Sequence, residues 1–258
     1  VVDEDAGGAG GTLACLVEGY TADALICTEP HNLNITISHA GINYFRVTVQ
    51  GRSAHAGLAH MGVNAIGKMY AIYRALEELD QKRGVEISFP LFAKGSGRAT
   101  HLNIGTMRAG EWPSTVPGDA VIECRIGYVP GETIQDIKAL IERTVQQAAA
   151  GDAWLRENPP KVEWFGWQAE PWYQDPEHPF VQMFLKSAAD IVSRNVEIIG
   201  RASGNDARFS QYFNMAGACT GPQAGNIHGI DEFVEIPSAV DVIKVLALTA
   251  LRWCGYQP

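Results

Sequence analysis

The sequence lacks the features that would assign it to several specialised classes of protein. It has no run of Lys and Arg, and 29 acidic against 20 basic residues give a formal net charge of −9. This balance argues against a nucleic acid or an anionic membrane surface as partner, because both require a positive patch. No apolar stretch reaches the roughly 20 residues of a membrane span. Residues 239–254 come nearest, but Asp241, Lys244 and Arg252 interrupt them.

Cysteines are few, odd in number and scattered. The five of them lie mostly inside apolar runs, at Cys15, Cys27, Cys124, Cys219 and Cys254. This pattern favours buried thiols in a reducing compartment over a disulfide framework or a zinc ribbon, so we expect a cytoplasmic protein. Internal repeats and low-complexity segments are also missing. With 46% hydrophobic and 19% charged residues, 258 residues predict a globular chain of one large domain or two modest ones.

The most informative stretch is the first dozen residues. Two valines, typical of a strand end, lead into three acids at residues 3–5. A glycine-rich turn at residues 7–11 precedes a predicted helix of roughly a dozen residues. Three neighbouring carboxylates repel one another, and a metal cation or a shared proton relieves that repulsion. A solvated acidic turn explains the same residues. A phosphate-binding loop does not, because the acids would repel a phosphate.

Periodicity along the rest of the chain predicts two interleaved domains. Strand and helix patterns between residues 40 and 170 follow the split βαβ order, which predicts an α+β, ferredoxin-like domain. Its four strands are expected to form an antiparallel sheet with two helices on one face. Residues 1–39 and 171–258 flank this insertion and predict an α/β domain.

Candidate ligands recur at the ends of the predicted core strands and in loops. Glu29 follows the strand at residues 24–27, His55 lies in a glycine-containing turn, and His228 lies in a glycine-containing loop. Each alone also fits an ordinary role, since single histidines are usually surface residues, and Asp206 and Arg208 also fit a simple ion pair. Together they supply the oxygen and nitrogen ligands that a divalent transition metal prefers.

A series of motifs in a fixed order makes the chain similar to a known family. Residues 3–8 resemble an Asp-Glu-Glu-x-Gly-Gly segment, Glu29 and Pro30 a metal-binding Glu-Pro, and residues 51–56 with 64–66 the start of an inserted dimerisation domain. Further matches are Asn103-Ile104-Gly105, Val116-Pro117, Arg125, Asp206-Ala207-Arg208 and residues 228–232. The chain thus resembles the aminoacylase, acetylornithine deacetylase and succinyl-diaminopimelate desuccinylase family of co-catalytic zinc hydrolases, which are metallopeptidase-like.

The resemblance implies a function, a cofactor and a role for each matched residue. It implies hydrolysis of the amide bond of an N-acyl amino acid at a site with two zinc ions, for which cobalt or manganese can substitute. Glu4 would be the general base, and His55 would act in the active site of a partner subunit. The implied metal ligands are Asp5, Glu29 and His228. The implied substrate-binding residues are Asn103, Arg125, Asn205 and Arg208.

Departures from the family pattern set further expectations. Asp5 replaces a usual glutamate, Asn205 a small hydroxyl residue and Ser114 an asparagine, so the acyl and amino-acid preference stays open. The family's His-x-Asp motif and its bridging aspartate have no counterpart here, so the catalytic domain is expected to be incomplete. We therefore expect this 258-residue chain to bind zinc weakly and to lack deacylase activity.

The same motifs allow other functions, and the predicted insertion suggests an oligomeric state. A dipeptidase or carboxypeptidase of the same family, or a non-catalytic dimerising relic, fits the same motifs. A homodimer is expected through residues 40–170, by way of the strand at 44–50 or the apolar face of the helix at 64–79.

Overall fold

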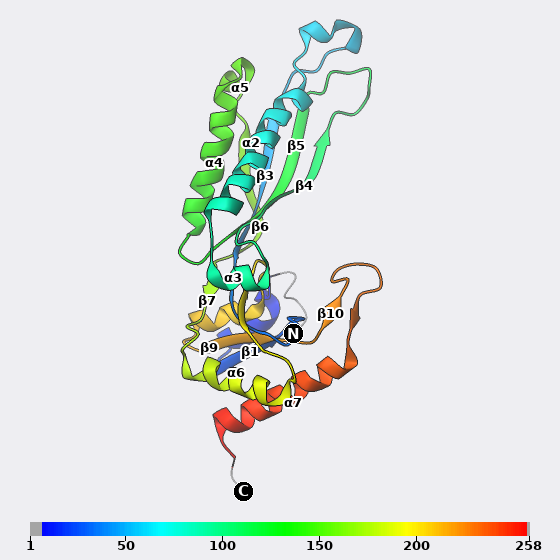
Figure 1. Ribbon diagram of the computed structural model, residues 1–258. Helices are drawn as coiled ribbons and strands as arrows, with labels where there is room; N and C mark the ends of the chain where they lie inside the picture. Colours follow the sequence, from blue (N-terminus) through cyan, green and yellow to red (C-terminus); the bar gives the residue numbers. More distant parts are fainter. Residues whose placement is uncertain (1–6, 257–258) are drawn as a thin grey trace. The chain divides into compact units, whose positions relative to one another are not determined.

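The computed structural model of the protein describes residues 7–256 and divides into two compact units (Figure 1). The first unit combines the described chain up to Ala40 with Phe89–Gly97 and the chain from Pro171. The second unit comprises Gly41–Ser88 and Arg98–Glu170. Within the described residues, no helix is both long and apolar enough to cross a membrane.

The first unit is built on a mixed five-stranded sheet. The sheet order is β1 (Ala24–Thr28), β9 (Ala216–Thr220), β2 (Ile35–His39) and β7 (Trp172–Tyr173), and β8 (Ile198–Arg201) also pairs with β2. Strands β1 and β9 are parallel, as are β2 and β8, whereas β2 runs antiparallel to β9 and β7. The carboxyl ends of β1 and β9 therefore lie at the same edge of the sheet.

Helices α6 (Pro179–Ile191) and α7 (Ile236–Cys254) bury one apolar stripe each in the core of this unit. Phe180 and Phe184 stack at 5.9 Å between ring centroids, and Val242 and Val245 face the same core. The spacing of these residues by three or four positions is the helical period that predicted both helices. A two-stranded hairpin, β10 (Ala224–Gly225) with β11 (Phe233–Val234), precedes α7.

Two short helical segments flank the sheet of the first unit. A π-helical turn (Ala9–Leu13) leads into α1 (Ala14–Val17), which is shorter than the dozen-residue helix that the sequence predicted. The 3-10 helix η4 (Asp206–Tyr212) packs against β1 and β9. The glycines of the opening turn explain why α1 is shorter than predicted, because glycine disfavours a regular helix.

Helix α3 (Pro90–Gly95) corrects the expected domain boundaries. Residues 40–170 were expected to form one insertion, but α3 packs on β8 of the first unit. Gly200 allows this contact, because a Cβ there would overlap the ring of the buried Phe92. The insertion is therefore interrupted by Phe89–Gly97.

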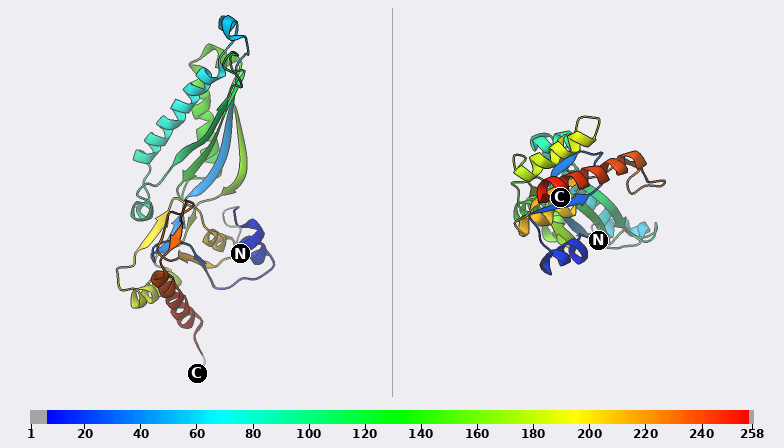
Figure 2. Two further views of the ribbon diagram at one scale, coloured as in Figure 1. Left: turned by 90° about the vertical axis from the view of Figure 1, so that its right-hand side faces the viewer. Right: turned by 90° about the horizontal axis from the view of Figure 1, so that it is seen from below.

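The second unit has the predicted α+β, ferredoxin-like architecture. Its four strands are all antiparallel, in the order β4 (Leu102–Ala109), β5 (Asp119–Tyr128), β3 (Gly41–Gln50) and β6 (Lys161–Ala169). Helices α2 (Ala65–Glu86) and α4 (Ile134–Ala150) cover one face, as Figures 1 and 2 show. The predicted antiparallel sheet with two helices on one face is confirmed.

The position of β3 in this sheet overturns one expectation. The strand at residues 44–50 was expected to offer a free edge for dimerisation, but β3 pairs with β5 on one side and β6 on the other. In the described part of the chain, the edges of this sheet are β4 and β6. The helix expected at 64–79 also uses Met69 and Leu76 for the core of the unit and leaves Ile66 and Tyr70 exposed.

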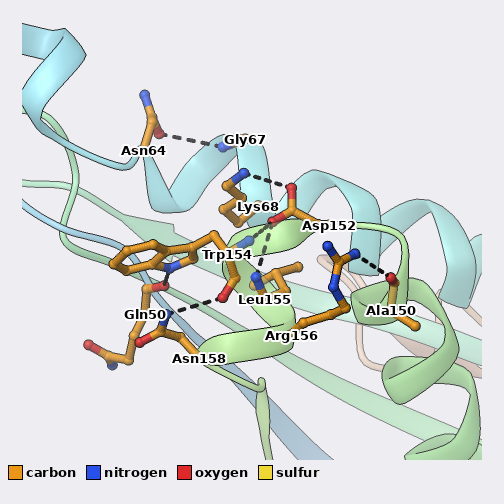
Figure 3. Close-up of polar contacts among 10 residues, drawn as sticks. All are labelled: Gln50, Asn64, Gly67, Lys68, Ala150, Asp152, Trp154, Leu155, Arg156 and Asn158. Atoms are coloured by element: carbon orange, nitrogen blue, oxygen red, sulfur yellow. Dashed lines mark hydrogen bonds and ion pairs between the residues drawn. The ribbon is translucent and has the colours of Figure 1, made fainter.

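Local caps fix the helix ends of the second unit. Thr133 and Asp136 form a capping box at the start of α4. Asp152 caps the short helix α5 (Ala153–Glu157), because its carboxylate accepts hydrogen bonds from the backbone of Trp154 and Leu155 at 2.9 and 3.1 Å (Figure 3). The same carboxylate accepts a 2.6 Å hydrogen bond from Lys68 on α2, which ties α5 to that helix.

Candidate active site

A cleft opens at the carboxyl end of β1 in the first unit. Its volume is about 370 Å³. It is lined by Thr12, Leu25, Ile26, Cys27, Thr28, Glu29 and Asp206. The opening turn, the strand β1 and the helix η4 thus supply polar groups to one site, although they are far apart in the sequence.

Asp206 anchors the opening turn to this cleft. It is 5% exposed, accepts a 2.6 Å hydrogen bond from the hydroxyl of Thr12, and lies 3.5 Å from the guanidinium of Arg208. Gly8 has a left-handed backbone (φ 66°), and a Cβ at this position would overlap the Asp206 carboxylate. Glycine is required here both by the backbone conformation and by the close approach.

Arg208 and Asn205, both predicted to bind substrate, are buried in the first unit. Arg208 donates hydrogen bonds to the backbone carbonyls of Gly7 and Asn205 and stacks at 4.1 Å over the ring of Phe209. Asn205 caps η4, because its side-chain oxygen accepts from the backbone of Ala207 at 3.0 Å. Both residues shape the loop that carries Asp206.

Glu29 lies directly beyond β1, as the sequence predicted. Its backbone N–H donates to the carbonyl of Thr220 at 3.1 Å, which extends the β1–β9 pairing by one residue. A Cβ at Gly221 would overlap the backbone carbonyl of Glu29. The strand end is therefore held closely against the neighbouring strand.

Two carboxylates, Asp206 and Glu29, act on the thiol of Cys27 in the cleft, and Arg208 partly opposes them. The pKa of the Cys27 thiol is raised to about 12, first by burial and then by the charges of Asp206 and Glu29. The thiol is consequently neutral at physiological pH. Two carboxylates at one site suit a cation.

The remaining predicted metal ligands are placed differently. His228 lies in the exposed loop between β10 and β11 and has a left-handed backbone (φ 60°), as do Asn226 and Asp231. Glu4 and Asp5 lie outside the described residues. Among residues 7–256, no group of three or more His, Cys, Asp and Glu side chains could hold a metal ion.

Asn103 and Arg125, the other predicted substrate-binding residues, are direct cross-strand neighbours in the second unit. His55 is exposed in the same unit, after β3, where its ring nitrogen Nδ1 accepts a 3.1 Å hydrogen bond from the backbone of Gly57. The second unit thus brings Asn103 and Arg125 together on adjacent strands.

Two histidines that no motif singled out are buried in the first unit. His31 lies 2.8 Å from the hydroxyl of Thr36 and 3.3 Å from the sulfur of Cys219. His39, fully buried, contacts the carbonyl of Ala40 at 2.8 Å. Burial is the main cause that lowers the pKa of His31 to about 3 and that of His39 to about 4. The proximity of His31 to Glu29 in the sequence was the only available signal.

Comparison with known proteins identifies relatives of the whole chain. The model of the peptidase dimerisation domain of the M20 family matches residues 37–153. The N-formyl-4-amino-5-aminomethyl-2-methylpyrimidine deformylase of Halalkalibacterium halodurans is 26% identical over 98% of this chain and 63% of its own length. A probable succinyl-diaminopimelate desuccinylase of Staphylococcus epidermidis is 24% identical over 88% of this chain and 60% of its own length.

A solved structure agrees in fold. The YxeP protein of Bacillus subtilis, described as a dinuclear metal-binding peptidase of the M20 family, superimposes with a TM-score of 0.65 at 15% identity. The match covers 95% of this chain and 61% of that one. The chain spans about three-fifths of the length of the relatives that it matches. Residues 37–153 therefore match the dimerisation domain of M20 peptidases, and the chain as a whole is similar to a deformylase and a probable desuccinylase that carry out hydrolysis.

Proposed function

We propose that the protein hydrolyses the amide bond of N-acyl amino acids at a site for two divalent metal ions, with zinc as the metal. The observation that carries this proposal is the cleft at the end of β1, which the carboxylates of Glu29 and Asp206 line together with the hydroxyl of Thr12. Two relatives, a deformylase and a probable desuccinylase, are named for removing acyl groups, which supports an acyl-amide substrate.

The first unit would provide the metal ligands. Glu29 would bind one metal ion, and His228 would bind the other together with Asp5. A bound divalent cation would supply Lewis-acid polarisation of the amide carbonyl. The carboxylate of Glu29, at the end of a strand in a cleft that Asp206 also lines, fits such a cation, although the described residues bring fewer than three candidate ligands together.

Proton transfer and substrate orientation would fall to other residues. Glu4 would accept the proton of the attacking water and deliver it to the leaving amine. Arg125 would hold the substrate carboxylate through its planar guanidinium, with Asn103 beside it. His55 would stabilise the developing oxyanion in the site of a partner subunit.

An activity panel tests this function. The natural gene product that contains these residues, loaded with zinc, is expected to hydrolyse N-acetyl amino acids. Glu29→Gln should lower both activity and bound metal by about a hundredfold or more, and Glu4→Gln should abolish turnover while retaining metal. Glu18→Gln, at the end of α1, is the matched control. Full activity of Glu29→Gln would remove this residue from the metal site.

The 258-residue chain on its own gives a separate test. We expect calorimetric titration to show zinc binding weaker than micromolar, because one or two ligands per metal leave both the bond number and the preorganisation low. Sub-micromolar binding would show that the chain already holds a complete site.

Peptide hydrolysis is the second candidate, since the structural neighbour YxeP is described as a peptidase. Faster turnover of dipeptides than of N-acetyl amino acids in the same panel would favour it. A natural protein that retains no metal and hydrolyses neither class would instead indicate a non-catalytic dimerising protein.

A homodimer through the second unit completes the proposal. The matched dimerisation domain covers most of this unit up to residue 153. Strand β4 is an edge strand, and α2 exposes Ile66 (42%) and Tyr70 (60%). These features support an interface at β4 and α2 rather than at β3.

A further inference from the structure

Four side chains form one transverse row across the sheet of the second unit. Asn103 on β4 pairs with Arg125 on β5, Arg125 pairs with Tyr44 on β3, and Tyr44 pairs with Phe165 on β6. Adjacent strands lie about 4.8 Å apart, so the row is about 14 Å long. One end is polar and cationic, and the other end is aromatic.

The aromatic half of this row lies on the face away from the helices. Phe45 and Trp164, the sequence neighbours of Tyr44 and Phe165, pack against the helices with 5.3 Å between their ring centroids. Successive side chains on a strand point to opposite faces, so Tyr44 and Phe165 occupy the open face, where both are half-buried. They do not contribute to the core of the unit.

Irregularities on both edge strands flank the row. The pairing of β3 with β6 shifts between Ile42 and Tyr44, and Gly166 on β6 has a left-handed backbone (φ 67°). As a result both Phe165 and Trp167 contact Tyr44, at 6.1 and 5.9 Å between ring centroids.

A second shift lies on the opposite edge. The pairing of β4 with β5 slips between Ile104 and Thr106, one residue pair beyond Asn103. Such bulges re-aim side chains and are frequent beside functional sites. A pairing shift therefore lies next to each end of the row, whereas Arg125 and Tyr44 stay in register with each other.

We infer that Tyr44, Phe165 and Trp167, here called the aromatic wall, determine substrate specificity by contacting a planar aromatic or heteroaromatic group of the substrate. The inference rests on the proposed function, in which Arg125 and Asn103 hold the polar end. Tyr44 lies one strand from Arg125 and Phe165 lies two strands from it. If the ligand's carboxylate binds Arg125, an extended ligand therefore reaches Tyr44 and Phe165 about 5–10 Å from that carboxylate. Aromatic rings in edge-to-face or offset contact recognise such a group.

Binding of paired ligands to the purified protein tests the inference. N-acetyl-phenylalanine is compared with N-acetyl-alanine, and N-benzoyl-glycine with N-acetyl-glycine, so that each pair differs in the presence of a ring. Calorimetry should give about threefold to tenfold tighter binding for the aromatic member of at least one pair. Tyr44→Leu and Phe165→Leu should remove that preference and leave the affinity for the aliphatic members unchanged.

Control variants separate specificity from folding and from the proposed function. Tyr20→Leu changes an exposed tyrosine of the first unit. It should alter neither the affinity for the aromatic ligands nor the affinity for the aliphatic ones. Thermal unfolding of each variant shows whether it is folded. Arg125→Gln should weaken the binding of all four ligands by a similar factor.

The possible results are distinguishable. The aromatic wall is overturned if the affinities within each pair are equal, or if the preference for the aromatic ligand survives in both leucine variants. If Arg125→Gln still weakens binding in that case, the proposed function stands and only the aromatic wall fails. Absence of binding by all four ligands overturns both the wall and the proposed substrate class.

Discussion

Gly8 and Asp206 meet where the glycine-rich turn passes over the start of η4. The left-handed backbone of Gly8 disfavours any other residue, and a methyl group there would overlap the carboxylate that Thr12 hydrogen-bonds. We expect Gly8→Ala to lower the free energy of unfolding by about 2–4 kcal/mol, from backbone strain and the clash together. Urea unfolding measures this loss.

Gly19→Ala provides the matched control at the residue scale. Gly19 is also left-handed (φ 95°), but no atom lies within 4 Å of the position of its Cβ. This variant should lose only the strain contribution, about 1–2 kcal/mol. Equal losses in the two variants would contradict a role for the Gly8–Asp206 contact.

The buried histidines predict a pH dependence of stability. Burial lowers the pKa of His31 to about 3 and that of His39 to about 4, whereas both titrate near 6.5 when unfolded. The positive charges of Arg201 near His31 and Arg208 near His39 act in the same direction. Below pH 6.5 the unfolded state binds protons that the folded state excludes, so stability is present above pH 6.5 and is lost toward pH 4.

The slope of this loss can be assigned to single residues. Each histidine contributes about 1.4 kcal/mol per pH unit, and His31→Gln should reduce the slope by about that amount. Urea unfolding at several pH values between 4.5 and 6.5 measures it. An unchanged slope in the variant would show that His31 is not the group that titrates.

At the scale of elements, Asp152 joins two functions in one carboxylate. It caps α5 and pairs with Lys68 of α2 (Figure 3). Asp152→Asn retains a good cap and removes the ion pair, so it should cost about 1 kcal/mol or less. Asp152→Ala removes both and should cost about 1–2 kcal/mol more.

Comparison of the two substitutions by thermal unfolding decides which role dominates. A loss in Asp152→Asn as large as that in Asp152→Ala would mean that the ion pair, and not the cap, stabilises this corner. Lys68→Met, which keeps the apolar stem of the side chain, should then match Asp152→Asn.

At the scale of the whole molecule, the proposed homodimer predicts the effect of charge on its interface. Tyr70→Glu combined with Met107→Glu places two acids on α2 and β4, where Met107 is 44% exposed. We expect the dimer dissociation constant to rise about thirtyfold or more. Sedimentation velocity at micromolar concentration measures the shift to monomer.

Val234→Glu is the corresponding control, since Val234 is an exposed apolar residue of the first unit (49%). It should leave the dimer intact. A native protein that sediments as a monomer would reject the homodimer, and a dimer that tolerates the double substitution would place the interface on another surface.

The sequence by itself determined the second unit and the similarity to M20 hydrolases. Alternation at residues 44–50 and 119–126 and the helical periods of α2 and α4 specify which face of each element is buried, and that information is local. The motifs at Glu29, His55 and Asp206 led to the M20 relatives for the same reason, since each is a short segment that can be recognised without its neighbours.

Only the tertiary structure decided which elements become neighbours. In the structure β3 lies inside its sheet, and α3 belongs to the first unit. Thr12 donates a hydrogen bond to Asp206, 194 positions away, and Arg125 pairs with Tyr44. Periodicity reports whether a side chain is buried but not what it is buried against. Pairing register and long-range contacts depend on the packing of distant segments, so the row beside Arg125 could not be predicted from any one stretch of the chain.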